Sequence, residues 1–158
     1  GANSNFAQAR NNYGIFLVRK KRYDDALKQF SRAAENVGYD NRGIAYENMG
    51  RIYSMQDKPE LAIDAYNKAL RLNPRGVALN LELAELYYKG GDIRSADFYY
   101  SNYARSTNPQ PARALWLGIR IAAELKQQDR IASYELALEK LYPESNEYQE
   151  WKKWRGKS

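Results

Sequence analysis

The side chains that most often perform chemistry in proteins are scarce in this chain of 158 residues. It contains no cysteine and no histidine, which excludes disulfides, thiolate nucleophiles and ordinary zinc sites. Two pairs of acids could supply titratable groups, Asp24 with Asp25 and Glu82 with Glu85. The first pair falls in the first turn of a predicted helix, where acids favour the helix dipole. The second pair lies one turn apart without a histidine nearby, so we interpret both pairs as structural or binding residues.

Other patterns that indicate catalysis or nucleotide binding are absent from the sequence. It has no Gly-rich phosphate loop, no nucleophile elbow and no metal-ligand spacing. The net charge of +6 would suit an anionic partner, but the Lys and Arg residues are interspersed with acids, as in residues 19–25. Such mixing is typical of solvated helix surfaces. We predict a non-enzymatic chain that uses no cofactor or metal and binds no nucleic acid.

Small residues recur at regular intervals along the chain. One series is spaced by 36, 34 and 34 residues: Gly14, Gly50, Ala84 and Gly118. A second series is spaced by 36, 34 and 36 residues: Ala26, Ala62, Ala96 and Ala132. A period of 34 is typical of the tetratricopeptide repeat (TPR), a helix–turn–helix unit. Glycine costs a helix interior nearly 1 kcal/mol relative to alanine, so its recurrence indicates that paired helices approach closely there.

These repeats predict an all-α fold, a right-handed superhelical solenoid of antiparallel helix pairs with a C-terminal capping helix. Turn signals agree, since Asp57 precedes Pro59 as a predicted N-cap, and Gly90, Gly91 and Asp92 end one helix and begin the next. The expected organisation is a linker or expression remnant at 1–6, repeat 1 at 7–42, repeat 2 at 43–76, repeat 3 at 77–110, an irregular repeat 4 at 111–144, and a capping helix and tail at 145–158 that carries Trp151 and Trp154.

The first helix of each repeat is expected to line a concave face that binds an extended polypeptide. The polar candidates on this face are Asn11, Asn12, Arg19, Glu47, Asn48, Arg51, Glu85, Tyr88 and Lys89, and the apolar ones are Ile15, Met55, Leu81, Leu115, Trp116 and Ile119. Trp116 is the sharpest candidate, because tryptophan is enriched among interface hot spots. The alternative is that Trp116 packs against the final helices. A carboxylate clamp for chaperone tails is not predicted, because no inward Lys accompanies Asn11 and Asn12.

Four stretches carry a more specific resemblance. They are residues 9–17 with 22–26, residues 45–50, the Leu-Trp-Leu-Gly-Ile-Arg stretch within 115–122, and residues 141–145. Over about residues 7–148 the chain resembles the TPR pilotin and pilus-stability proteins of type IV pilus systems, the PilF/PilW family. A two-residue insertion before repeat 2 and a lengthened first helix in repeat 4 are part of this resemblance.

The resemblance implies a lipoprotein on the periplasmic side of the outer membrane that binds the pilus secretin and promotes its localisation and multimerisation. It implies membrane contact only through an N-terminal lipid anchor, which this chain lacks, and a correspondence to the C-terminal four repeats of the family. Two alternative functions stay open, a generic TPR adaptor in another bacterial envelope complex and a regulatory TPR domain excised from an enzyme. A homodimer through exposed end repeats is an additional expected association.

Overall fold

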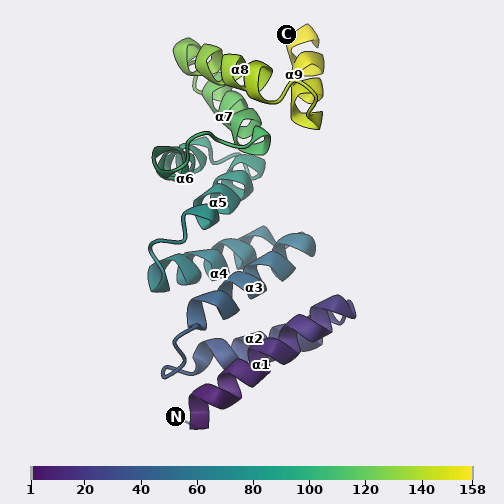
Figure 1. Cartoon of the computed structure of the whole chain (residues 1–158), viewed down its shortest axis with the longest axis vertical. Helices are drawn as coiled ribbons and strands as arrows, with labels where there is room; N and C mark the ends of the chain where they lie inside the picture. The colour runs from purple at the N-terminus through teal and green to yellow at the C-terminus, as the bar shows by residue number, and fades with distance from the viewer. Residues whose placement is uncertain (1, 158) are drawn as a thin grey trace. The chain divides into compact units, whose positions relative to one another are not determined.

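The structure, a computed structural model, describes the backbone of residues 2–157 and the side chains of residues 4–156 (Figure 1). All regular elements within this part of the chain are α-helices, which confirms the all-α prediction. The helices are α1 (Ala2–Arg19), α2 (Tyr23–Glu35), α3 (Arg42–Met55), α4 (Pro59–Leu72), α5 (Val77–Lys89), α6 (Ile93–Ser106), α7 (Ala112–Glu124), α8 (Gln128–Leu141) and α9 (Asn146–Lys157). None of the helices described has the length and apolar character needed to cross a bilayer.

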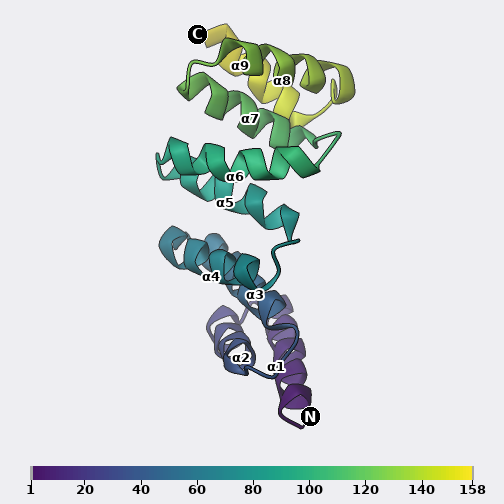
Figure 2. The ribbon, with the colours of Figure 1, turned by 90° about the vertical axis from the view of Figure 1, so that its left-hand side faces the viewer.

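The chain divides between Leu79 and Asn80 into two compact parts, the N-terminal half and the C-terminal half. In the N-terminal half α1 lies beside α2 and α3 beside α4, and α2 also packs on α3 (Figures 1 and 2). Because glycine has no Cβ, the two helices of each pair can pack closely together. A Cβ added at Gly14 would lie 2.5 Å from the ring of Phe30, and one added at Gly50 would lie 2.7 Å from the ring of Tyr66. The steric reason predicted for these glycines is therefore confirmed.

In the C-terminal half α7 packs against α6, α8 and α9. Trp151 of α9 is buried in one apolar cluster with Leu115 and Ile119 of α7 and Leu138 of α8. This packing covers the last pair of helices, as predicted for a capping helix. Asp92 begins α6 as predicted, since its carboxylate accepts a hydrogen bond from the backbone N–H of Ser95 at 3.1 Å.

The connections between helices correct the predicted register of the last repeat. A residue with positive φ follows the first helix of every pair: Lys21, Asp57, Gly91 and Lys126, at intervals of 36, 34 and 35 residues. Three residues connect the helices within each pair, whereas six, four and five residues connect one pair to the next. The link ahead of α7 is thus one residue longer than the link ahead of α5.

This added residue moves the small-residue positions of repeat 4. Ala132 is exposed, unlike the buried Ala26, Ala62 and Ala96, and the residue in their register is the half-buried Ile131. Gly118 lies against Tyr100 of the preceding helix pair rather than against a helix of its own pair. A Cβ added at Gly118 would lie 2.7 Å from the ring carbon Cζ of Tyr100. The predicted lengthening of α7 is also wrong, because α7 and α5 both have 13 residues.

Two local predictions fail. The stretch 1–6 is not a linker in its described part, because α1 begins at Ala2 and the hydroxyl of Ser4 donates to the carbonyl of Gly38 at 2.7 Å; Gly1, like Ser158, lies outside the described residues. Asp57 is not the N-cap of α4, because it adopts the left-handed conformation and Lys58 takes the cap position without a side-chain hydrogen bond. The boundaries of the four repeats stay a prediction.

Candidate protein-binding surface

Six of the predicted polar surface residues lie on α1 and α3 of the N-terminal half. The structure brings two of them together, since the amide of Asn48 donates to the amide oxygen of Asn11 at 3.4 Å. Asn11 is only 3% exposed, so its side chain serves the contact between α1 and α3. Asn12 is exposed and accepts a hydrogen bond from Gln8, one turn earlier on α1.

A groove of about 380 Å³ lies between α1 and α3. Its lining residues are Ile15, Val18, Arg19, Phe30, Asn48, Arg51, Ile52 and Met55. Phe30 and Ile52 are buried and form an apolar floor, whereas Arg19, Arg51 and Met55 are exposed. The predicted surface residues Arg19, Asn48 and Arg51 therefore share one concave apolar site.

Val18, Phe30 and Ile52 are groove residues that the sequence prediction missed. Val18 and Ile52 follow Ile15 and Asn48 by three and four residues, the spacing of neighbours on one helix face. This spacing could have added them to the predicted surface. Phe30 belongs to α2, so the periodicity of α1 and α3 gave no signal for it; its ring lies against Gly14 and lines the groove.

The charged groups on α3 form a local pair. Arg51 lies 2.8 Å from the carboxylate of Glu47, one turn earlier, and the side chain of Arg51 remains 64% exposed. Glu47 also lines a second hollow of about 350 Å³ beside Asp40 and Ile44. The guanidinium of Arg19 forms no ion pair with any residue that the structure describes. Both arginines can therefore offer their N–H groups to a partner.

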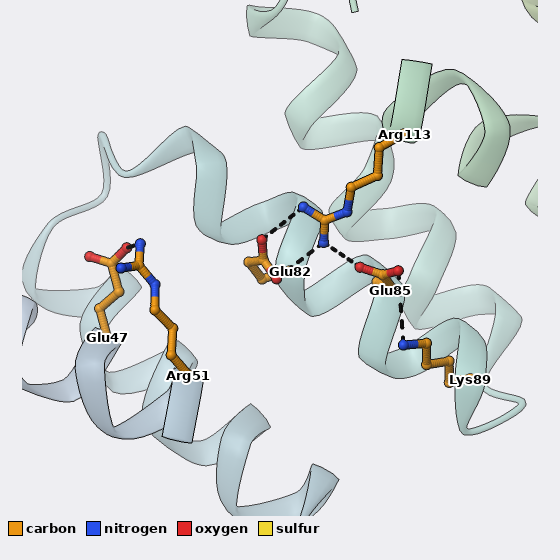
Figure 3. A network of polar contacts seen from close by, with 6 residues as sticks. All are labelled: Glu47, Arg51, Glu82, Glu85, Lys89 and Arg113. Carbon is orange, nitrogen blue, oxygen red and sulfur yellow. Dashed lines mark hydrogen bonds and ion pairs between the residues drawn. The ribbon is translucent and has the colours of Figure 1, made fainter. Parts of the chain in front are cut away.

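The C-terminal half holds the other predicted residues, and the charged ones among them form ion pairs within this half. Arg113 of α7 donates to both carboxylate oxygens of Glu82 on α5, at 3.0 and 3.2 Å, and also contacts Glu85 (Figure 3). Lys89 lies 3.9 Å from Glu85 on the same helix. Burial disfavours the charged form of Arg113, but hydrogen bonds and charges from the two glutamates outweigh it and raise the pKa of Arg113. Glu82 and Glu85 therefore act as one structural ion-pair network.

Of the two arrangements considered for Trp116 from the sequence, the structure shows packing against the final helices. Trp116 is 7% exposed, its indole N–H donates to the carboxylate of Glu150 at 2.9 Å, and its ring meets the edge of Trp154 at 5.7 Å. Trp116 thus packs against α9 and leaves little of its ring to a partner. The sequence could not distinguish these arrangements, because both require an apolar ring on α7.

Arg120 of α7 holds the position in its repeat that corresponds to Arg51 of the groove, six residues before the positive-φ residue. Its guanidinium lies 5.2 Å from the ring centre of Tyr88 and 4.8 Å from that of Trp116. Such stacking holds a cation over aromatic faces. Tyr88 is a predicted polar contact for a partner, and the guanidinium of Arg120 covers one face of its ring.

Comparison with known proteins agrees with this helical architecture. A family model described as tetratricopeptide repeat matches residues 5–75. The type IV pilus assembly protein PilF of Pseudomonas aeruginosa is 39% identical to the chain over 150 residues, which is 95% of this chain and 59% of that protein. The solved structure of P. aeruginosa PilF superposes with a TM-score of 0.84 at 40% identity, covering 92% of this chain and 65% of the other.

The chain is a tetratricopeptide-repeat protein of the PilF/PilW family. The crystal structure of PilW, described as a widely conserved type IV pilus biogenesis factor, is also similar, with a TM-score of 0.78 at 28% identity over 90% of this chain and 66% of PilW. The chain therefore spans about three fifths of the curated PilF and about two thirds of the two solved family members. The predicted family and TPR fold are confirmed.

Proposed function

We propose that the chain is a non-enzymatic protein-binding scaffold of type IV pilus assembly, a pilotin that binds the outer-membrane secretin and promotes its localisation and multimerisation. The single observation that carries this proposal is 39% identity over 95% of the chain to a protein named for type IV pilus assembly. The proposal places the scaffold on the periplasmic side of the outer membrane, where the full-length protein is lipid-anchored.

The geometry supports binding over catalysis. The acids closest to a catalytic pair, Glu82 and Glu85, are held by Arg113 and so lack the freedom of a general acid or base. The groove between α1 and α3, by contrast, offers an apolar floor and exposed polar groups, the combination that recognises an extended polypeptide.

Deletion of the gene tests the proposal. We expect cells without it to lose surface pili and to contain less secretin in the heat-resistant multimeric form, measured by electron microscopy and by immunoblots of unboiled samples. Expression of the wild-type gene should restore both. Normal pili together with normal secretin multimers in the deletion strain would exclude the pilotin role.

A further inference from the structure

The groove between α1 and α3 has an apolar interior of limited size. Ile15 and Val18 form its α1 side, Ile52 its α3 side, and the buried ring of Phe30 closes it below. A volume of about 380 Å³ accommodates one or two aliphatic side chains rather than a folded domain. The interior therefore suits a short extended segment that inserts an aliphatic side chain.

Positive charge flanks this interior on both helices. Arg19 ends α1 and is exposed without an ion pair among the described residues, and Arg51 is 64% exposed on α3. Figure 3 shows the guanidinium of Arg51 turned toward Glu47, which leaves further N–H donors on its fork. Two guanidinium groups beside an apolar interior are complementary to a carboxylate next to an aliphatic side chain.

The backbone around the groove identifies the source of that carboxylate. All eight lining residues lie inside α1, α2 or α3, where backbone N–H groups are used by the helices themselves. Capture of a chain terminus commonly relies on unpaired backbone N–H groups, which this groove does not provide. Only side chains can therefore recognise a ligand in this groove. The carboxylate of an internal Asp or Glu can approach both arginines, and a C-terminal carboxylate is not required.

We infer that this groove binds an extended partner segment carrying an acidic side chain within two residues of an aliphatic one, with the carboxylate between Arg19 and Arg51. The inference rests on the proposed protein-binding role and deepens it by assigning the chemistry of the bound segment. An anionic membrane surface would contact the arginines but would leave Ile52 and Phe30 without an occupant.

A displayed library of random decapeptides tests this assignment. The decapeptides are inserted within a coat protein, so that they have no free C-terminal carboxylate. Selection on the chain should enrich Asp or Glu within two residues of Leu, Ile or Val. Failure to select any peptide, or selection without acidic residues, would overturn the inference.

Synthetic forms of the best selected peptide then locate the site by fluorescence polarisation. Arg19→Glu and Arg51→Glu should each weaken binding by about tenfold, since they replace an attraction with a repulsion. Replacing the acid of the peptide by its amide should weaken binding by a similar factor. The matched control is Arg32→Glu, an exposed arginine of α2 outside the groove, which should change the affinity by less than about twofold.

A second variant tests the groove itself without changing charge. Val18→Tyr supplies Arg51 with a ring like the Tyr88 on which Arg120 lies, so it should close the groove and weaken binding by about tenfold. Circular dichroism checks that helix content is kept. Unchanged affinity in Val18→Tyr and in both charge reversals would place the peptide elsewhere and overturn the inference.

Binding to phosphatidylglycerol vesicles tests the competing hypothesis that the two arginines contact an anionic membrane surface. Cosedimentation with these vesicles that depends on Arg19 and Arg51, with no peptide selected, would assign the surface to a membrane and reject a peptide. The gene deletion scores pilus assembly independently of the groove. If the groove binds no peptide but the deletion strain loses its pili, only the peptide assignment is rejected. Normal pili together with normal secretin multimers in that strain would reject the pilotin role.

Discussion

The two halves of the chain use one scaffold of helix pairs but treat equivalent positions differently. Counted back from the positive-φ residues, Arg51 and Arg120 hold the same place, six residues before Asp57 and Lys126. Arg51 pairs with the half-buried Glu47 and borders an open groove, whereas Arg120 stacks on Tyr88 and Trp116. The difference comes from neighbouring side chains, because Val18 occupies the position equivalent to Tyr88 and Glu47 the position equivalent to Trp116.

This comparison indicates that a few neighbouring side chains decide whether an arginine of this helical frame borders an open groove or is packed against aromatic rings. The arginine itself does not distinguish an open site from a closed one. An aromatic neighbour turns it inward and converts a potential contact into packing, whereas an aliphatic neighbour leaves it available. Three substitutions test the difference between the halves, in order of decreasing effect.

Removal of the Trp116 ring should have the largest effect. Trp116→Ala leaves a cavity beneath α9 and removes a donor from Glu150, so we expect the free energy of unfolding to fall by about 4 kcal/mol. Urea unfolding followed by circular dichroism measures it. The control is Met55→Ala, because Met55 is 60% exposed and should change stability by less than about 1 kcal/mol. A Trp116→Ala variant of nearly wild-type stability would show that the ring is not part of the packing.

Disruption of the contact between α3 and α4 in the N-terminal half should have the next largest effect on stability. Gly50→Leu pushes a side chain into the ring of Tyr66 and separates α3 from α4, with an expected loss of about 3 kcal/mol. Thermal denaturation provides the measurement. Gly156→Ala is the matched control, because nothing lies within 4 Å of its added Cβ, and it should be neutral or slightly stabilising. Equal stability of the two variants would contradict the close contact at Gly50.

Loss of the stacking between Arg120 and Tyr88 should have the smallest effect on the free energy of unfolding. Tyr88→Val introduces the residue type found at the equivalent position in the N-terminal half and should cost about 1 kcal/mol. A double-mutant cycle with Arg120→Gln isolates the coupling between the two side chains, and the same cycle on Val18 and Arg51 should give roughly zero. Equal coupling in both halves would remove the distinction between the open and closed sites.

Much of this architecture follows from the sequence, because helix pairs repeat and glycines mark close contacts. Gly14 and Gly50 could be interpreted correctly from spacing alone, since a costly residue that recurs needs a steric reason. The failures lie where several arrangements satisfy the same pattern. Ala132 matched a small-residue period, yet a single residue added to a link placed Ile131 in that position instead.

The candidate surface was predictable in part for a similar reason. Helical periodicity placed Arg19, Asn48 and Arg51 on one face, and the structure brings them to one groove. Periodicity does not report what covers a face. The burial of Trp116 depends on α9, whose Glu150 lies 34 residues further along the chain, and the ion pair of Glu85 depends on Arg113 of the following pair.

The unequal links between helix pairs have a practical consequence for labelling. A connection of three residues within each pair tolerates no change in length without shifting one helix against the other, but links of six, four and five residues already vary. Val37 in the first of these links is 83% exposed. Because the chain contains no cysteine, Val37→Cys would introduce a unique thiol at a site that carries neither packing nor the groove, suitable for a fluorophore or a spin label.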